Sequence, residues 1–404
     1  MTDTSSGAYS WGVKMIRIRT VTYNIPMHFN DNMFSQIENS VKLFSKIDYE
    51  VHTQRINLTP LNNRIEDSII AEVALFCHKN DIRWFNIPLD IWDYQQVRNE
   101  EIRDVLSQYK DAFVNCICAK DARVKKSILE FIARQMLVNA DADSEGLINF
   151  RFGASMNVSP NGPFFPYTYS EENIASFSIG LEMAEELNDV LRLRTLNLTQ
   201  IESLIFEVLE PQVFEIEQIA KDISVSTGLV YRGIDFSLAP LLKEHNSVIS
   251  ILNSLGISRI DDTGAMFATA FLTRILKAFS VNHKAVGFSG VMYSLIEDKI
   301  YAEDNNSKGF SIDRMIALST MCGCGCDMIP IPFETSVEDI KTILLEIACI
   351  SSRLKKPLGV RLLPIKSNDE YTHFSGESDF CINTRIVNIH SNNSIPLNRK
   401  YFFG

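Results

Sequence analysis

Short runs rich in β-branched and aromatic residues alternate with amphipathic stretches along the chain, and this alternation constrains the fold more than any other feature. In the first third of the chain, strands are predicted over 15–25, 82–89, 112–120 and 147–154. Apolar residues recur at helical spacing between them, over 64–80 and 121–137. Strands that alternate with helices favour a parallel α/β core over a β-sandwich.

The middle of the chain departs from this rhythm. Two long helical patterns follow one another, over 170–192 and 199–224. Ser170 and the two acidic residues after it suit a helix N-terminus, and Pro211 should kink or divide the second pattern. We therefore expect a helical hairpin over 170–224, added to the sheet.

The alternation then resumes and continues toward the C-terminus. A strand is predicted within 228–240 and an apolar helix over 265–280, and the pattern goes on through 284–298, 315–330, 336–356 and 357–365. We find no linker rich in Pro, Gly or Ser and no internal repeat. The prediction is a single α/β domain over 14–404, preceded by an irregular or disordered extension over 1–13.

Composition and charge limit the classes of partner. With 404 residues and 46% hydrophobic content the chain can bury a large core. A net charge of −11 without a dense Lys/Arg run argues against nucleic acid. A secretory leader and an eighteen-residue apolar run are both missing, so we expect a cytoplasmic protein with no membrane partner. Its eight cysteines are then expected to stay reduced, and a homo-oligomer is allowed.

The stretch MCGCGCDMIP, residues 321–330, places three cysteines at alternate positions before Asp327. Three interpretations stay open: a metal site, a reactive thiol, or a packed glycine turn. Thiolate metal sites usually use C-x-x-C spacing, which weakens the first interpretation. His283 and His373 are candidate fourth ligands, although nothing in the sequence brings them near the cysteines.

Loops that follow strands hold the other candidates, because ligands bind at the carboxyl ends of parallel strands. The loop 157–170 is either a rigid connection whose Phe164 and Phe165 plug the core or a pocket wall preceding an anion-binding helix N-terminus. Asp235 and Ser237 share one face of a strand end.

Two further loops complete the candidates. Ser289 lies in GFSG, whose likeness to a hydrolase elbow fails at Val291. Arg361 in a buried strand needs a carboxylate or a ligand anion, and Asp327 or Asp235 could serve. The loop after Arg361 carries His373, which is either a site residue or part of a solvated loop.

Several motifs, taken in order, resemble the domain-of-unknown-function 711 (DUF711) family. They are MIRIRTVTYN, PFFPYTY, GIDFSLAP, GFSGVMYSLIEDKIYA, MCGCGCDMIPIP, and KPLGVRLLPI followed by DEYTHF. The resemblance covers roughly residues 14–390. The family is grouped by fold with pyruvate formate-lyase, whose core is a ten-stranded α/β barrel around a cysteine finger loop. The resemblance thus implies such a barrel, which periodicity alone does not decide.

The family pattern at the finger loop is close to C-G-x-G-L-D-T-V-P-x-P-G-D. Cys322 and Asp327 match it together with the glycines and prolines around them, whereas Cys324, Cys326 and the Phe333–Glu334 pair depart from it. Glycyl radical enzymes also need a C-terminal R-V-x-G-Y-type loop, and this chain ends NSIPLNRKYFFG. The resemblance therefore implies a protein on a radical-enzyme scaffold that stores no glycyl radical.

The leading functional expectation is an enzyme that acts on a small, carboxylate-bearing metabolite inside the barrel, in a biosynthetic pathway. Cys322 would be nucleophile or acid/base, and Asp235 and Asp327 would be general acid/base or metal ligands. Arg361 would clamp the anion. The remaining substrate-binding candidates are Ser237, Ser289, Phe165, Cys324 and His373.

Two alternatives come from other classes. One is a ligand-binding or regulatory protein that kept the barrel without catalysis. The other is a divalent-metal-dependent lyase or hydrolase in which Asp235, Glu297 and Asp298 hold a hard cation, because Mg²⁺ and Ca²⁺ prefer oxygen ligands.

Overall fold

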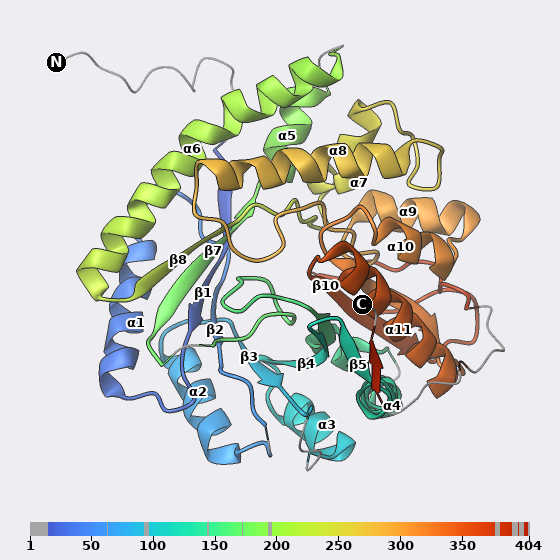
Figure 1. The fold of residues 1–404 in the computed structure, drawn as a ribbon, viewed down its shortest axis with the longest axis horizontal. Helices are drawn as coiled ribbons and strands as arrows, with labels where there is room; N and C mark the ends of the chain where they lie inside the picture. The colour runs from blue at the N-terminus through green and yellow to red at the C-terminus, as the bar shows by residue number, and fades with distance from the viewer. Residues whose placement is uncertain are drawn as a thin grey trace.

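A computed structural model of the protein describes residues 15–62, 64–92, 97–143, 145–171, 173–192, 196–375, 380–389, 395 and 400–402. The extension expected over 1–13 lies outside these residues. Within them the chain is a mixed α/β structure in which strands surround the centre of the view and helices lie around the outside (Figure 1). The α/β class predicted from the alternation is confirmed.

One mostly parallel sheet contains the described strands, in the order β8-β7-β1-β2-β3-β4-β6-β10-β9, with β5 beside β4 and β11 beside β5. Their bounds are β1 Arg17–Asn24, β2 Gln54–Asn57, β3 Trp84–Leu89, β4 Ala112–Lys120, β5 Arg123–Lys125, β6 Phe152–Met156, β7 Ser176–Glu182, β8 Val230–Asp235, β9 Gly325–Pro332, β10 Leu358–Ile365 and β11 Lys400–Phe402.

The strands fall into two parallel sets that run in opposite directions. β1, β2, β3, β4 and β6 pair in parallel, as do β7 with β8 and β9 with β10. The sets join through antiparallel pairs, β1 with β7 and β6 with β10. Between β8 and β9, the segment 285–294 makes parallel bridges to Ile234 and Leu238 on one side and to Asp327 on the other.

Helices on the outside cover the sheet, because each carries an apolar face that packs against the strands. Their bounds are α1 Asp31–Phe44, α2 Asp67–Lys79, α3 Asn99–Gln108, α4 Lys126–Ala142, α5 Ala184–Leu191, α6 Leu198–Thr227, α7 Val248–Ser254, α8 Ala265–Ala278, α9 Lys299–Lys308, α10 Ile312–Leu318 and α11 Val337–Leu354. In the described part of the chain, none of them combines the length and the apolarity that crossing a membrane requires.

The helical hairpin expected over 170–224 is wrong in its first half. That half contains the strand β7, followed by the short helix α5. Phe177, Ile179 and Leu181 alternate with small residues in β7, which is the two-residue period of a strand. Every residue of β7 is buried. When the strand is combined with the apolar and acidic residues of α5 that follow it, the whole stretch resembles a helical pattern.

The second helix of that hairpin is confirmed as α6. Asn197 begins it with a capping box, and Gly228 ends it in the left-handed conformation at φ 78°. The helix continues through Pro211, so the predicted division there does not occur. A proline removes one intrahelical hydrogen bond, and the buried Val208 and Val213 on either side of it hold the helix against the core.

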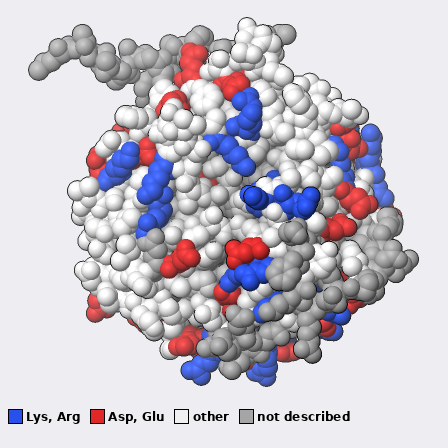
Figure 2. All heavy atoms as spheres, in the orientation of Figure 1, with Lys and Arg blue, Asp and Glu red and all other residues white. Residues whose placement is uncertain are grey.

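Several elements were not predicted from the sequence patterns, among them α1, β2, α3, α7 and α9. Residues 147–151, expected in a strand, form a 3₁₀ turn, and β6 begins at Phe152. Charged side chains of both signs occur on the face shown in Figure 2, in separate groups.

Candidate functional site

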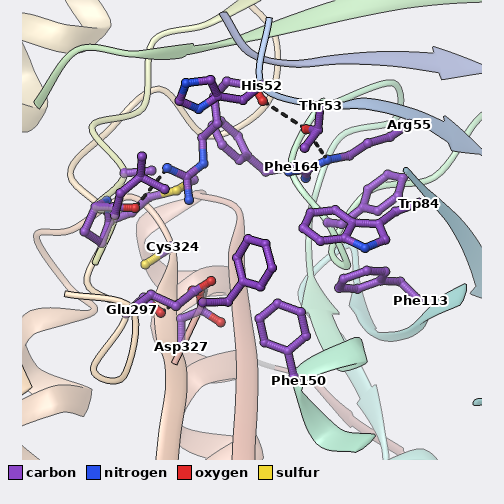
Figure 3. A pocket seen from close by; sticks show the side chains of 18 of the residues that line it. His52, Thr53, Arg55, Trp84, Phe113, Phe150, Phe164, Glu297, Cys324 and Asp327 are labelled. Atoms are coloured by element: carbon purple, nitrogen blue, oxygen red, sulfur yellow. Dashed lines mark hydrogen bonds between the residues drawn. The ribbon is translucent and has the colours of Figure 1, made fainter. Parts of the chain in front are cut away.

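An internal cavity of about 390 Å³ lies where the N-terminal ends of β1–β4 meet the residues that follow β8 and those at the start of β9. Figure 3 shows side chains from these elements pointing into it. The carboxyl ends of parallel strands are the usual place for a ligand, and Pro240 follows β8 at this edge. The lining includes Arg19, Thr53, Arg55, Trp84, Phe165, Tyr167, Glu297, Cys324, Asp327 and Arg361.

The loop between β6 and β7 supplies part of the cavity wall. Strand side chains hold it in place: Thr22 Oγ1 donates to the Pro163 carbonyl at 2.9 Å, and Asn86 Nδ2 donates to the Thr168 carbonyl at 2.8 Å. Phe165 and Tyr167 thereby lie against the cavity. The loop forms a pocket wall, as one of its two interpretations held, but a strand follows it in place of the expected helix N-terminus.

Aromatic rings form a continuous apolar surface beside the cavity. Trp84 lies 5.3 Å from Phe113 and 5.5 Å from Phe380 between ring centroids, and Phe113 lies 5.6 Å from both Phe150 and Phe165. Such offset rings suit a flat or apolar portion of a small molecule.

Arg55 is a buried cation of this cavity that forms no ion pair with an acidic residue of the described ranges. Its side chain is buried, and its guanidinium carbon lies 4.7 Å from the Trp84 centroid and 5.3 Å from that of Phe165. Nε donates to Thr53 Oγ1 at 3.0 Å (Figure 3), and no carboxylate among the described residues pairs with it. Burial and then the neighbouring arginines lower the pKa of Arg55 well below its usual value. A bound anion would offset both the cost of burying the Arg55 charge and the repulsion from the neighbouring arginines.

Arg361, in contrast, is already paired with carboxylates of the protein. Its Nε donates to Asp327 Oδ1 at 2.5 Å and its Nη2 to Oδ2 at 2.8 Å, with Glu297 3.3 Å from Nη2. Tyr167 donates its hydroxyl to Asp327 Oδ1. Asp327, and not Asp235, is thus the carboxylate that the buried arginine requires. Burial opposes the charge, but Asp327, Tyr167 and Glu297 raise the pKa of Arg361.

The three thiols of the stretch 321–330 lie in different surroundings. Cys324 belongs to the cavity wall, with the Tyr293 amide donating to its sulfur at 3.3 Å. Cys322 lies behind it, does not line the cavity, and accepts from the Gly325 amide at 3.4 Å. Cys326 faces Ser319 Oγ at 3.6 Å. All three are buried.

Cys322 and Cys324 titrate as a coupled pair. A hydrogen bond from Cys324 lowers the pKa of Cys322 to about 6; burial opposes this shift, and Lys356 reinforces it. The same hydrogen bond, together with burial, raises the pKa of Cys324 well above its usual value. Lys356 Nζ reaches this position by donating to the Ser319 carbonyl at 3.0 Å and to the Cys322 carbonyl. The hydrogen bond thus favours the thiolate form of Cys322 and the protonated form of Cys324.

The glycines between the cysteines are required by packing. A Cβ on Gly323 would lie 2.9 Å from the Gly290 backbone, and one on Gly325, at φ 96°, would lie 2.3 Å from the Gly359 carbonyl oxygen. The stretch is therefore a packed glycine turn that also carries three buried thiols, and the reactivity of those thiols stays a prediction.

Asp235 does not line the cavity, and its carboxylate accepts hydrogen bonds from residues on two loops. Its Oδ1 accepts from the amides of Ser237 and Ser289, each at 2.9 Å, and from Ser237 Oγ at 2.6 Å, while Oδ2 accepts from the Phe288 amide at 2.8 Å. Burial raises the pKa of Asp235 despite these bonds. The structure brings three predicted site residues together here, but none of them lines the cavity.

The residues proposed for a metal do not converge. Asp298 begins α9 and accepts from Ser247 Oγ at 2.6 Å, and burial raises its pKa to about 6. Glu297 lines the cavity, whereas Asp235 does not. Across the described ranges, no group of three or more His, Cys, Asp or Glu is arranged to hold a metal ion.

The two histidines lie apart from the thiols. His283 sits between Glu217 and Glu210, at 3.0 and 3.2 Å. His373 is exposed and pairs with Asp369 at 2.9 Å, outside the cavity lining.

Sequence reasoning missed Arg55 and Trp84, although Arg361 was found. The signal was the same in both arginines, a charged residue within a run of strand-forming residues: QRIN around Arg55 and GVRLL around Arg361. The β2 strand is four residues long, too short to be predicted from its pattern, so Arg55 was not recognised as buried.

Fold and cavity together define a mostly parallel α/β protein with an internal site lined by arginines and aromatic rings. The chain belongs to the family described as uncharacterised ACR (DUF711), whose model matches residues 13–375. The family resemblance noted from the motifs is confirmed.

Relatives carry the name UPF0210 protein. The one from Pyrobaculum aerophilum is 27% identical over 55% of this chain and 51% of its own length. The one from Methanosarcina acetivorans is 28% identical over 87% of this chain and 85% of its own length. The chain thus spans about half the length of the first relative and most of the second.

Proposed function

We propose that the protein is a thiol-dependent enzyme that binds a small carboxylate-bearing metabolite in the 390 Å³ cavity. The observation that carries the proposal is Arg55, a buried guanidinium without an acidic partner in the described part of the chain, set against aromatic rings in the cavity that contains the Cys324 thiol. An unpaired buried charge is costly, and a ligand carboxylate is the bidentate partner that a guanidinium prefers.

The proposed chemistry uses the thiol pair. Cys324 gives its proton to the Cys322 thiolate, and the Cys324 sulfur then adds to an electrophilic carbonyl carbon of the bound metabolite. The electron pair of the carbonyl π bond moves to the oxygen, which takes up a proton from water, so no leaving group is required. Lys356 supports the thiolate while it rests on Cys322. This assignment moves the nucleophile from Cys322 to Cys324, because Cys324 belongs to the cavity wall. Arg55 takes the anion-binding role expected of Arg361, which is already paired.

We also propose the finer fold implied by the family, a closed ten-stranded barrel of the pyruvate formate-lyase type with the thiols on its finger loop. The support is the segment 285–294, which bridges β8 and β9 and so links the two ends of the strand order. Leu238 N donates to the Gly290 carbonyl at 3.0 Å, and Met292 N donates back to the Leu238 carbonyl at 2.9 Å. A cytoplasmic, biosynthetic setting fits free thiols, which a reducing compartment preserves.

Alkylation with two matched reagents tests the proposal without knowledge of the substrate. Iodoacetate carries a carboxylate beside its electrophilic carbon, and iodoacetamide is its neutral counterpart. We expect iodoacetate to label Cys324 roughly ten-fold faster than iodoacetamide, relative to the rate ratio for glutathione in the same buffer. Mass spectrometry of peptides locates the label. Cys324 is fully buried but forms part of the cavity wall, so a reagent that enters the cavity meets this thiol first.

Arg55→Met should abolish the preference for iodoacetate and leave the iodoacetamide rate within a factor of about two. Lys308→Met is the matched control, because Lys308 is an exposed cation at the end of α9 that does not line the cavity. Labelling confined to the partly exposed Cys349, or a preference that survives Arg55→Met, would count against the proposal.

A further inference from the structure

A second hollow continues the cavity beyond its aromatic wall. This hollow of about 330 Å³ shares Arg83, Trp84, Phe150 and Phe380 with the first cavity. One group of side chains thus belongs to both walls. The two hollows therefore adjoin one another at these side chains.

Two arginines flank the ring at the centre of this shared wall. The guanidinium carbon of Arg55 lies 4.7 Å from the Trp84 centroid, and that of Arg83 lies 4.8 Å from the same point. Arg83 also lies 4.6 Å from the Phe380 centroid. Stacking on aromatic rings favours each cation, but the two like charges repel one another.

The carboxylate that lines the second hollow forms no ion pair with Arg83 or Lys110. This carboxylate is Asp143, whose Oδ1 and Oδ2 accept from the backbone amides of Glu145 and Ile148, at 3.1 and 3.0 Å. Lys110 also lines the hollow and is exposed. Within the described residues neither Arg83 nor Lys110 makes an ion pair.

The unpaired cations around the two hollows contrast with the negative net charge of the whole chain. The net charge is −11, yet Arg55, Arg83 and Lys110 line these two adjoining hollows and form no ion pair in the part of the chain that the structure describes. Exposed cations elsewhere on the surface commonly pair with acids, as Arg274 does with Glu202 at 2.7 Å. Cations that form no ion pair and lie in two adjoining hollows suit a ligand with two negative groups.

We propose that the substrate of this site is an elongated dianion. It places a carboxylate on Arg55, an apolar or planar middle portion over Trp84 and Phe150, and a second anionic group, carboxylate or phosphate, between Arg83 and Lys110. This inference rests on the proposed function, which requires only the first carboxylate.

Calorimetric titration with paired probes tests the second anion. The probes are straight-chain dicarboxylates of three to seven carbons, the monocarboxylates of equal length, and ω-phosphono carboxylates. We expect the best dicarboxylate or phosphono carboxylate to bind roughly ten-fold more tightly than the matched monocarboxylate, because one further charge-assisted contact forms. Which of the two second groups binds more tightly distinguishes carboxylate from phosphate.

Variants separate this inference from the function on which it rests. Lys110→Met should reduce the dianion-to-monoanion ratio toward one while leaving monocarboxylate affinity unchanged. Arg83→Met should also reduce this ratio, and Lys308→Met should alter neither the ratio nor the monocarboxylate affinity. A ratio near one in the unmodified protein, with monocarboxylate binding still dependent on Arg55, overturns the dianion and leaves the proposed function standing. Monocarboxylate binding that is indifferent to Arg55→Met overturns the proposed function itself.

Discussion

At the scale of single residues, the thiol pair depends on one buried lysine. Lys356 follows α11 directly, and its ammonium is fixed by backbone carbonyls beside Cys322. Burial lowers the pKa of Lys356, and the nearby Cys322 thiolate raises it. The two charges therefore support one another, in keeping with the lowered pKa of Cys322.

Lys356→Met should raise the pH at which the pair becomes reactive. In the unmodified protein the iodoacetamide rate at Cys324 should rise with pH through a midpoint near 6, because the thiolate form grows as pH passes the lowered pKa of Cys322. Without the ammonium the midpoint should move up by about one pH unit, since one unit corresponds to about 1.4 kcal/mol of lost interaction. Alkylation rates between pH 5 and 9 measure it, with Lys355→Met as the control.

A midpoint unchanged in Lys356→Met would show that Cys324 and the backbone amides, and not the lysine, hold the thiolate. Lys355 suits the control because it is adjacent in sequence, exposed, and has no hydrogen bond to the thiol loop among the described residues. A general loss of helix α11 would affect both variants alike.

The sequence singled out part of this site and not the rest, for a physical reason. Cys322, Cys324, Asp327 and Arg361 stood out because thiols and charges in an apolar context are chemically unusual. Apart from Phe165, the aromatic wall did not, since Trp84 and its neighbours have the composition of any core. Their arrangement around Arg55 depends on the register of β2 against β3, which local sequence does not encode.

At the scale of elements, contacts between backbones determine the conformation of the loop that carries Cys322 and Cys324. Gly323 and Gly290 approach each other so closely that a Cβ on either would meet the other's backbone at 2.9 Å. The amide of Gly323 also donates to the Val291 carbonyl at 2.5 Å. Position 323 thus tolerates no side chain unless one of the two loops moves.

Gly323→Ala should destabilise the protein by about 1–3 kcal/mol, because the added methyl group overpacks a buried contact between two backbones. The same change should slow labelling of Cys324 if the loop shifts. Gly162→Ala is the control, since its Cβ would meet neighbours at no less than 3.4 Å. Urea unfolding measures the free energy difference, and equal stability of the two variants would contradict the packing argument.

Element prediction succeeded where one period dominated a segment and failed where two were mixed. β3, β4, α8 and β10 have clear periods and were found near their observed bounds. β7 and α5 adjoin within one stretch, so their combined pattern imitated a single helix. Tertiary pairing decides such cases, because β7 is buried on both sides between β1 and β8.

At the scale of the whole molecule, Asp235 connects β8 to the segment that bridges toward β9. Its carboxylate accepts from the amides of Ser237, Phe288 and Ser289. A Cβ on Gly287 would lie 2.0 Å from its Oδ2, so the segment is packed directly against the acid. Asp235 therefore holds the segment 285–294 in place, and the proposed closure of the barrel depends on this segment.

Hydrogen exchange should show this dependence. If the barrel closes through the segment 285–294, the amides of Val286 and Met292, which donate to Ile234 and Leu238, should exchange as slowly as those of central strands such as β3. Asp235→Asn places an amide donor where only an acceptor fits, so we expect a loss of about 1–3 kcal/mol and protection roughly ten-fold or more lower over this segment. Amides of β2 and β3 should change less, because the first set of parallel strands pairs independently of this segment. Fast exchange of Val286 and Met292 already in the unmodified protein would show that the sheet stays open between β8 and β9.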